Sequence, residues 1–467
     1  MARVQTASVS VEHPRAFQLP VTIAGIWKAF WVEPWSFKFT CIYIFFDYVR
    51  PQEVYPALQI LPWAQLTLAG ACASFILEGR RIVSKTFANW LLATFGLVVL
   101  LSSMLAFSPD DSFDKINIVV SWLVLFFLMA NTATDQRKFH LMIVLFLVWS
   151  TKMSQHGARA FLTGSGSAGG APGYFQNTGE FALQMCIYVP LAIYFIFGLR
   201  PLLSKQKVLI LSLLPVAGVL GIINSGSRGG FLGLAAVGLW MLLRSKHKLR
   251  GFASLIVLVP ILWILTPEYQ KERFRTAGDD ETSVSRLVYW KRGVEMANKH
   301  PVLGVGYENW VPYSVAFYPP KSGELVKWIA PGVYAIEVSH NIFIEVLSQL
   351  GYTGLLLYSS ILTYIWVLNR RTRLLLKQLG ENGRFLREIS YGLDAGVIGF
   401  IVAGFFMAVA FYPFTWVQLG LAGALHSAAL RTIALTAGNA QIAAPLRTPK
   451  PRSGWRSRRL AIGGVRN

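Results

Sequence analysis

The sequence predicts an all-α, polytopic membrane protein of about 12 transmembrane helices, with one large periplasmic loop and with cytoplasmic N- and C-termini. Hydrophobic residues make up 54% of the chain and charged residues 14%, a balance typical of polytopic membrane proteins. Apolar runs near 20 residues recur, each long enough to cross about 30 Å of hydrocarbon. Basic residues are concentrated in alternate loops, which fixes the orientation of the helices.

The chain divides into five regions in order. Residues 1–36 form a predicted cytoplasmic leader, whose tryptophan-rich later part suits an interfacial helix. Predicted helices 1–9 fill 37–267, a large loop fills 268–339, helices 10–12 fill 340–436, and 437–467 is a basic cytoplasmic tail. The predicted spans are 37–50, 58–78, 87–107, 115–133, 138–152, 179–198, 207–224, 229–244, 251–267, 340–368, 391–412 and 415–436.

The loop charges give this arrangement its direction. The net charge of +21 (44 basic against 23 acidic residues) favours contact with anionic membrane lipid rather than with nucleic acid. The short loops predicted to face inward hold 18 basic residues: Arg80, Arg81, Lys85, Arg137, Lys138, Arg200, Lys205, Lys207, Arg244, Lys246, Lys248, Arg250, Arg370, Arg371, Arg373, Lys377, Arg384 and Arg387. Those predicted to face outward hold 5: Arg50, Lys115, Lys152, Arg159 and Arg228. The segment 268–339 is therefore expected outside, in the periplasm of a Gram-negative cell.

A second outward segment is predicted over 155–178. It contains Arg159 and a glycine- and serine-rich run from 164 to 173. Such a run lets backbone amides approach an anion closely, and a plain flexible linker is the alternative interpretation. No Gly-Lys-Ser/Thr follows, so the run is not a nucleotide-binding P-loop.

Three arginines are candidates for binding an anion. Arg228 lies at a predicted membrane boundary, where an arginine either snorkels to lipid headgroups or meets an anion. Arg286 and Arg292 flank Trp290 on a predicted amphipathic helix that His300 ends, and an exposed, salt-bridged face is the alternative for both. A guanidinium suits phosphate because its planar fork makes two charge-assisted bonds and stays protonated.

One histidine is a candidate general base. His340 begins a predicted spanning helix at the outer surface, next to Asn341 and near Glu337. A neutral imidazole at this position suits proton abstraction, since the helix N-terminus disfavours the charged form; a helix cap is the alternative role. Asp279, Asp280 and Glu281 are contiguous and have no histidine partner, so we expect neither a metal nor a cofactor.

Four segments between about 225 and 358 resemble the O-antigen ligase and O-antigen polymerase superfamily. They are Ser227-Arg228-Gly229-Gly230, then Arg286 with Trp290, then His300-Pro301-Val302-Leu303-Gly304-Val305-Gly306, then His340-Asn341-Ile342-Phe343-Ile344-Glu345 with Gly351 and Gly354. The resemblance implies an inverting, metal-independent glycosyltransferase of the bacterial inner membrane. Its donor would be a glycan on undecaprenyl pyrophosphate, and its acceptor a lipid A core, a glycan or a protein.

The resemblance also implies roles for these residues. Arg228 and Arg286, with Arg292 added less directly, would bind the donor pyrophosphate, and His340 would activate the acceptor hydroxyl. Trp290, Asn341, Glu337 and Arg159 would support them. A polymerase of the same superfamily remains an alternative. A transporter or flippase for a lipid-linked anion is the alternative from another class, but its ionisable groups would lie at mid-membrane depth, whereas these are predicted at one face.

Overall fold

The computed structural model describes residues 19–164, 175, 177–245, 247–266, 268–276, 281–319, 328–330, 333–334 and 337–443. The first 18 residues of the predicted leader, the glycine- and serine-rich run after Gly164, Asp279 and Asp280, the middle of the large loop and the basic tail after Ala443 lie outside the described residues, and α17 continues into the predicted tail as far as Ala443. The statements below concern the described residues.

The fold is helical, as predicted. The helices are α1 (Ile23–Trp31), α2 (Trp35–Ile44), η2 (Phe45–Val49), α3 (Pro51–Val54), η3 (Pro56–Leu58), α4 (Trp63–Leu77), α5 (Phe87–Met104), α6 (Pro109–Thr132), α7 (Gln136–Thr163), α8 (Thr178–Leu199), η4 (Arg200–Leu202), α9 (Lys205–Ser225), α10 (Arg228–Arg244), α11 (Lys248–Leu265), α12 (Glu268–Arg275), α13 (Glu281–Lys299), α14 (Trp310–Phe317), α15 (Ile342–Leu376), η5 (Lys377–Gly383), α16 (Arg384–Gly404) and α17 (Pro413–Ala443). The only β-structure among these residues is an antiparallel pair, β1 (Trp328–Ala330) and β2 (Val333–Tyr334), which the all-α prediction did not include.

Each of the predicted spans overlaps a helix, but α16 ends at Gly404, so the last part of the span predicted over 391–412 is a turn and not a helix. Six helical stretches among the described residues are long and apolar enough to cross a membrane: Phe87–Met104, Pro109–Thr132, Thr178–Leu202, Lys205–Ser225, Ile342–Gly404 and Pro413–Ala437. The fifth contains both α15 and α16, which are joined through η5. These stretches indicate a helical membrane protein, and the count of 12 spans stays a prediction.

Some predicted boundaries are wrong. The helix predicted over 138–152 continues to Thr163 and ends at Gly164, whose φ of 64° is the left-handed conformation that glycine adopts at helix ends. Lys152 and Arg159 are therefore helical rather than loop residues. Arg373, predicted in an inner loop, is buried within α15, where its Nη1 lies 2.6 Å from Asp394 Oδ2 on α16. This carboxylate, together with hydrogen bonds from Arg373 Nη1 to the carbonyl and hydroxyl of Ser390, makes the buried arginine tolerable.

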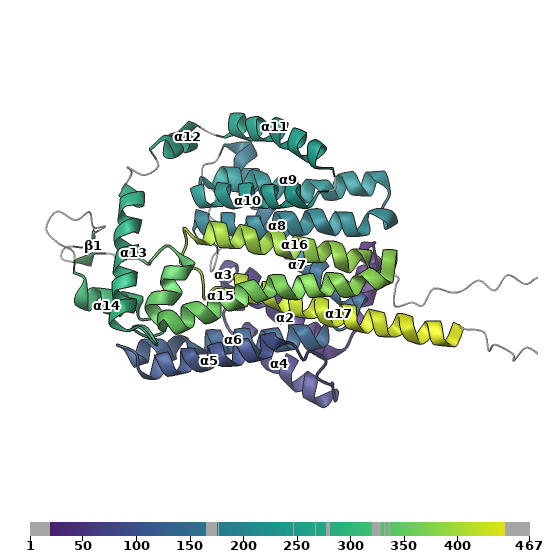
Figure 1. Ribbon diagram of the computed structural model, residues 1–467, viewed down its shortest axis with the longest axis horizontal. Helices are drawn as coiled ribbons and strands as arrows, with labels where there is room; N and C mark the ends of the chain where they lie inside the picture. Colours follow the sequence, from purple (N-terminus) through teal and green to yellow (C-terminus); the bar gives the residue numbers. More distant parts are fainter. Residues whose placement is uncertain are drawn as a thin grey trace, which may run out of the picture.

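The loops between the long helices gather at two opposite ends of the bundle. At one end, on the left of Figure 1, α13 and α14 stand beside the starts of α10 and α15; we call this the loop end. The segments predicted to face inward meet at the other end, the inner end. There the backbone amides of Val83 and Ser84 donate to Asn131 Oδ1, and Arg384 donates to the Phe197 carbonyl.

Helix α8 forms the centre of the bundle and is almost entirely buried, between α9, α10 and α16. Its start is fixed by a capping box, in which Asn177 accepts from Gly179 N at 2.8 Å and Glu180 reaches back to Asn177 N. Small residues let α10 and α16 approach it closely, since a Cβ on Gly233 would lie 2.9 Å from Cys186 Sγ. This packing places the start of α10 beside the end of α16.

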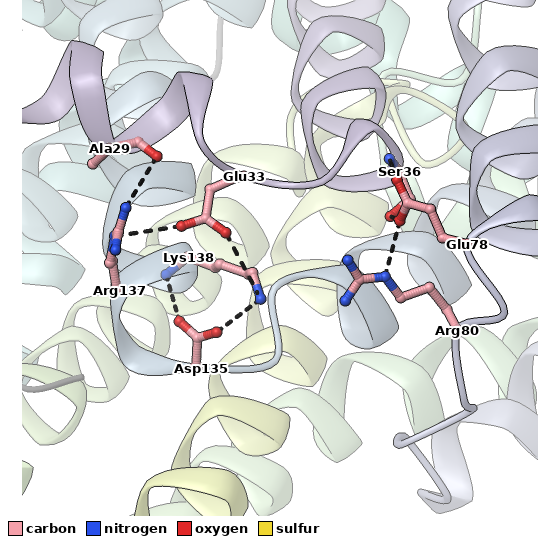
Figure 2. A network of polar contacts seen from close by, with 8 residues as sticks. All are labelled: Ala29, Glu33, Ser36, Glu78, Arg80, Asp135, Arg137 and Lys138. Carbon is pink, nitrogen blue, oxygen red and sulfur yellow. Dashed lines mark hydrogen bonds and ion pairs between the residues drawn. The ribbon is translucent and has the colours of Figure 1, made fainter. Parts of the chain in front are cut away.

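A network of ion pairs holds the inner end together (Figure 2). Glu33, just before α2, lies 3.3 Å from Arg137 Nε and 3.8 Å from Lys138 Nζ on α7. Lys138 also pairs with Asp135 at 2.9 Å. Alongside, Glu78 accepts from the Ser36 hydroxyl at 2.6 Å and pairs with Arg80 at 2.9 Å. These contacts connect the leader and α2 to the end of α4 and to the start of α7.

Candidate active site

The segment from Pro301 to Gly306 docks on a break in α15. Gly351 has φ 66° and ψ −169°, so the helix is interrupted there and the carbonyls just before it need other partners. Val305 N donates to Ser348 O at 2.9 Å, and Tyr352 N donates to Pro301 O at 2.8 Å. A Cβ on Gly351 would lie 2.6 Å from Pro301 O, so a side chain has no room. Gly304 of the predicted Pro-x-x-Gly-Val-Gly element has φ 68°, and a Cβ there would lie 2.5 Å from Gln349 O, so this glycine too has a structural role in fixing the large loop to α15.

This docking also ties the loop to the turn between α5 and α6. Ser102 Oγ donates to Leu303 O at 2.8 Å, and Phe107 N donates to Val305 O at 2.9 Å. Asn309 then binds both backbone groups of Ser108, its Oδ1 accepting from Ser108 N at 2.5 Å. The end of α13 and the start of α14 are consequently held rigidly over the loop end.

Helix α13 presents Arg286 and Trp290 to the bundle. At roughly 100° per residue, the two side chains lie roughly 40° apart on the helix surface. The Arg286 guanidinium lies 6.0 Å from the centre of the Phe406 ring, and Trp290 packs edge-on against Phe405 with 5.2 Å between ring centres. The Trp290 indole N–H is buried and has no hydrogen-bond partner among the described residues. A bound ligand with an acceptor oxygen would satisfy it.

Arg228 is the first residue of α10. Ser227 caps the helix, its hydroxyl accepting from Gly230 N at 3.2 Å. A Cβ on Gly229, the next residue, would lie 3.2 Å from Phe406 Cβ, so the start of α10 packs against the residue that Arg286 faces. The N-terminal amides of α10 add partial positive charge beside the Arg228 backbone.

His340 precedes the first turn of α15. Its φ of 48° is left-handed, a conformation that few non-glycine residues adopt and that Arg50 and Glu308 share in this chain. Asn341 is the N-cap and accepts from Phe343 N at 2.8 Å and from Ile344 N at 3.2 Å. The half-buried imidazole, 20% exposed, has its Nε2 3.4 Å from Glu337 Oε2. Glu337 is held in turn, because its carbonyl accepts from Trp310 Nε1 at 3.0 Å.

The starts of α10 and α15 and the face of α13 meet at the turn that follows α16. Phe406 contacts Gly229 and faces Arg286, and Phe405 contacts both Trp290 and Phe343, the latter with 6.4 Å between ring centres. The structure therefore brings the surroundings of Arg228, Arg286 and His340 together at the loop end.

Two predicted residues lie apart from this centre. Arg292 is roughly 120° around α13 from Arg286, and its guanidinium lies 5.9 Å from the Tyr289 ring centre and 5.8 Å from that of Tyr318. Arg159 is exposed on α7. It shares the loop end with Arg228, because the nearby Gly157 packs against Gly221 near the end of α9.

Residues that sequence reasoning did not select also build this centre. Phe405 and Phe406 read as ordinary apolar residues of a span, so no sequence signal marked them. Glu345 is buried in α15, and its Oε2 accepts from Ala410 N at 2.9 Å, which fixes the chain after α16 to α15. Burying a carboxylate among apolar residues costs free energy, so Glu345 within an apolar segment was a sequence signal for a structural or functional role.

No group of three or more histidine, cysteine, aspartate or glutamate side chains among the described residues is placed to hold a metal ion. Glu281, predicted beside Asp279 and Asp280, begins α13.

Two family models match separate parts of the chain. Residues 208–359 match a family model described as O-Antigen ligase. This match supports a relationship of that part of the chain to the O-antigen ligase and polymerase superfamily. The O-antigen ligase match begins in α9, ends in α15, and includes Arg228, Arg286 and His340, whereas Phe405 and Phe406 lie beyond it. Residues 20–195 match a family of unknown function, and no curated protein matches the chain.

Proposed function

We propose that the protein is an inverting, metal-independent glycosyltransferase of the O-antigen ligase type. It transfers a glycan from undecaprenyl pyrophosphate to an acceptor hydroxyl, that of a lipid A core, at the outer face of the bacterial inner membrane. The observation that carries the proposal is the meeting of Arg286 and the starts of α10 and α15 at Phe405 and Phe406, beside the O-antigen ligase match.

The donor pyrophosphate binds between Arg228 and Arg286. Both groups are permanently cationic, and the start of α10 adds backbone N–H donors. The buried Trp290 N–H supplies one more donor to a phosphate oxygen. Fixed positive charge there stabilises the charge that develops on the departing pyrophosphate.

His340 is the general base. Its Nε2 faces Glu337, which leaves Nδ1 to take the proton of the acceptor hydroxyl and lets Glu337 stabilise the imidazolium that forms. The acceptor oxygen attacks the anomeric carbon as the bond from that carbon to the phosphate oxygen breaks. Attack from the side opposite the leaving group inverts the anomeric centre. The leaving group is undecaprenyl pyrophosphate, so the step needs no nucleotide.

The loop end faces the periplasm, and the chain crosses the membrane 12 times. The excess of basic residues in the segments predicted to face inward supports this orientation, and it remains after Arg373, Lys152 and Arg159 are assigned to helices. The grouping of predicted inner segments at one end, and of α13, α14 and the docking loop at the other, also favours it.

The test uses purified full-length protein, a fluorescent glycan on undecaprenyl pyrophosphate, and lipid A core acceptor, with transfer read on a gel. Wild type should transfer the glycan, with no loss on adding a chelator. His340→Ala should lower the rate on the order of 10²-fold or more. His340→Gln should not restore it, since an amide cannot take the proton. Both variants should still bind undecaprenyl pyrophosphate.

Other outcomes would contradict specific parts of the proposal. Near-normal transfer by His340→Gln would show that His340 is not the general base and has only a structural role at the start of α15. A ladder of repeat units formed from donor alone would identify a polymerase instead of a ligase. Loss of transfer with chelator would contradict metal independence.

A further inference from the structure

A row of tyrosines and cations runs along α13 away from the pyrophosphate site. It consists of Tyr289, Arg292, Tyr318 and Lys299, and we call it the tyrosine–cation row. The Tyr289 ring lies between His340, at 6.5 Å between ring centres, and the Arg292 guanidinium, at 5.9 Å. Tyr318 follows, with Arg292 5.8 Å and Lys299 Nζ 5.4 Å from its ring centre.

The row begins at His340 and is separate from the donor side. Arg286 and Trp290 face Phe406 and Phe405 on a different face of α13. At roughly 100° per residue, Tyr289 lies roughly 60° and Arg292 roughly 120° around α13 from Arg286, so a molecule on the row would approach the imidazole beside the donor site. An inverting enzyme needs its acceptor in a site distinct from that of the leaving group.

The chemistry of the row suits sugar rings. Tyr289, Arg292 and Tyr318 are half-buried and Lys299 is exposed, so the row is accessible from solvent. The electron-rich face of a tyrosine attracts the weakly positive C–H groups on the flat side of a pyranose ring. Cationic donors between the rings can bind hydroxyl or phosphate oxygens on the edge of the sugar.

We propose that the tyrosine–cation row binds the sugar chain of the acceptor and directs its hydroxyl to His340. The proposal rests on the proposed function, and it moves Arg292 from the pyrophosphate site, where the sequence placed it, to the acceptor site. The cation-to-ring distances lie at the outer limit of cation–π attraction.

The experiment measures binding of two probes to purified full-length protein in nanodiscs. One probe is the oligosaccharide released from lipopolysaccharide by mild acid, which carries no lipid. The other is undecaprenyl pyrophosphate without sugar. The variants are Tyr289→Leu, Tyr318→Leu, the matching phenylalanine variants and Arg292→Gln. Tyr352→Leu is the matched control, because Tyr352 is an exposed tyrosine that contacts α13 through Asn298 and lies outside the row.

Each leucine variant should raise the Kd for the oligosaccharide about three- to tenfold, and the phenylalanine variants should stay within about twofold. Arg292→Gln should also weaken oligosaccharide binding. Tyr352→Leu should match wild type, and undecaprenyl pyrophosphate should bind all these variants equally. In the transfer assay the acceptor KM should rise while the donor KM does not. Lys299→Ala, at an exposed position, covers the case of a leucine variant that does not fold, and it should weaken oligosaccharide binding too.

Three results would overturn the acceptor site: wild type that does not bind the oligosaccharide, leucine variants that bind it like wild type, or phenylalanine variants that lose as much as leucine variants. Binding of undecaprenyl pyrophosphate by Arg286→Ala distinguishes an incorrect acceptor site from an incorrect proposed function. If Arg286→Ala loses undecaprenyl pyrophosphate while the row variants change nothing, only the acceptor site is wrong. If Arg286→Ala binds undecaprenyl pyrophosphate like wild type, the donor site is wrong.

Discussion

The two ends of the bundle use their cations differently. At the inner end Arg137, Lys138 and Arg80 lie 2.9–3.8 Å from the carboxylates of Glu33, Asp135 and Glu78 (Figure 2). At the loop end Arg286 and Arg292 lie beside aromatic rings. The rings orient the two guanidinium groups, while Lys115 at the same end pairs with Glu308 at 3.6 Å, so the ends differ in what surrounds Arg286 and Arg292 and not in whether ion pairs occur. We therefore expect the inner end to contribute stability and the loop end to bind anions.

The largest effect should come from the arginines of the loop end. Arg286→Ala and Arg228→Ala should each lower glycan transfer on the order of 10²-fold, since each removes a charge that stabilises the leaving group. Lysine should rescue only in part, because a point charge lacks the two-pronged geometry. Arg275→Ala is the control, since Arg275 is an exposed arginine on α12 paired with Glu272 at 3.1 Å. Wild-type transfer by both alanine variants would contradict the distinction between the ends.

A second comparison concerns the stability cost of replacing one glycine at each end of the bundle. Gly351→Ala should destabilise the protein on the order of 3 kcal/mol, because a left-handed residue is strained and its Cβ would meet Pro301 O at 2.6 Å. Gly79, near the inner end, has φ 58° and no atom within 4 Å of a built Cβ, so Gly79→Ala should cost only about 1 kcal/mol. Thermal unfolding in detergent measures both. Equal losses would mean that the docking loop does not brace the break in α15.

Removing an inner-end carboxylate should affect stability and not chemistry. Glu33→Gln separates Arg137 and Lys138 from their partner, and its expected cost is about 1 kcal/mol for a partly exposed network. Transfer per folded molecule should match wild type. A kcat loss comparable to that of Arg286→Ala would show that the inner end also takes part in catalysis.

The smallest effect concerns Glu308, which lies 3.6 Å from Lys115 at the loop end. Burial raises the pKa of this carboxyl above its ordinary value, and Lys115 offsets that rise only in part. The folded protein therefore binds this proton more tightly than the unfolded chain does, so Glu308 contributes most stability at low pH. That contribution is lost as pH rises from 4.5 through the raised pKa.

Glu308→Gln should remove this part of the pH dependence and change stability by less than about 1 kcal/mol at neutral pH. Unfolding midpoints of both proteins across this pH range provide the check. Parallel curves for wild type and Glu308→Gln would contradict the assigned proton linkage.

The sequence predicted the helices well because hydrophobicity is a local signal. Every predicted span overlaps a helix, yet α7 extends beyond its apolar run because its last turns pack against α9 through Gly157. The placement of Arg228, Arg286 and His340 at one end followed from the positive-inside rule combined with the motif resemblance. The sequence did not predict contacts between residues that are distant along the chain. Arg292 lies beside Tyr318, and Gly351 packs against Pro301, and neither contact has a local sequence signal.

The most direct test of the account is which compartment each end faces. Reporter fusions after Lys248 and after Arg384, both at the inner end, should read cytoplasmic. A fusion at Ser322, in the part of the large loop outside the described residues, should read periplasmic. A cytoplasmic signal at Ser322 would place Arg228, Arg286 and His340 on the wrong side of the membrane, and the proposed transfer from undecaprenyl pyrophosphate would be wrong.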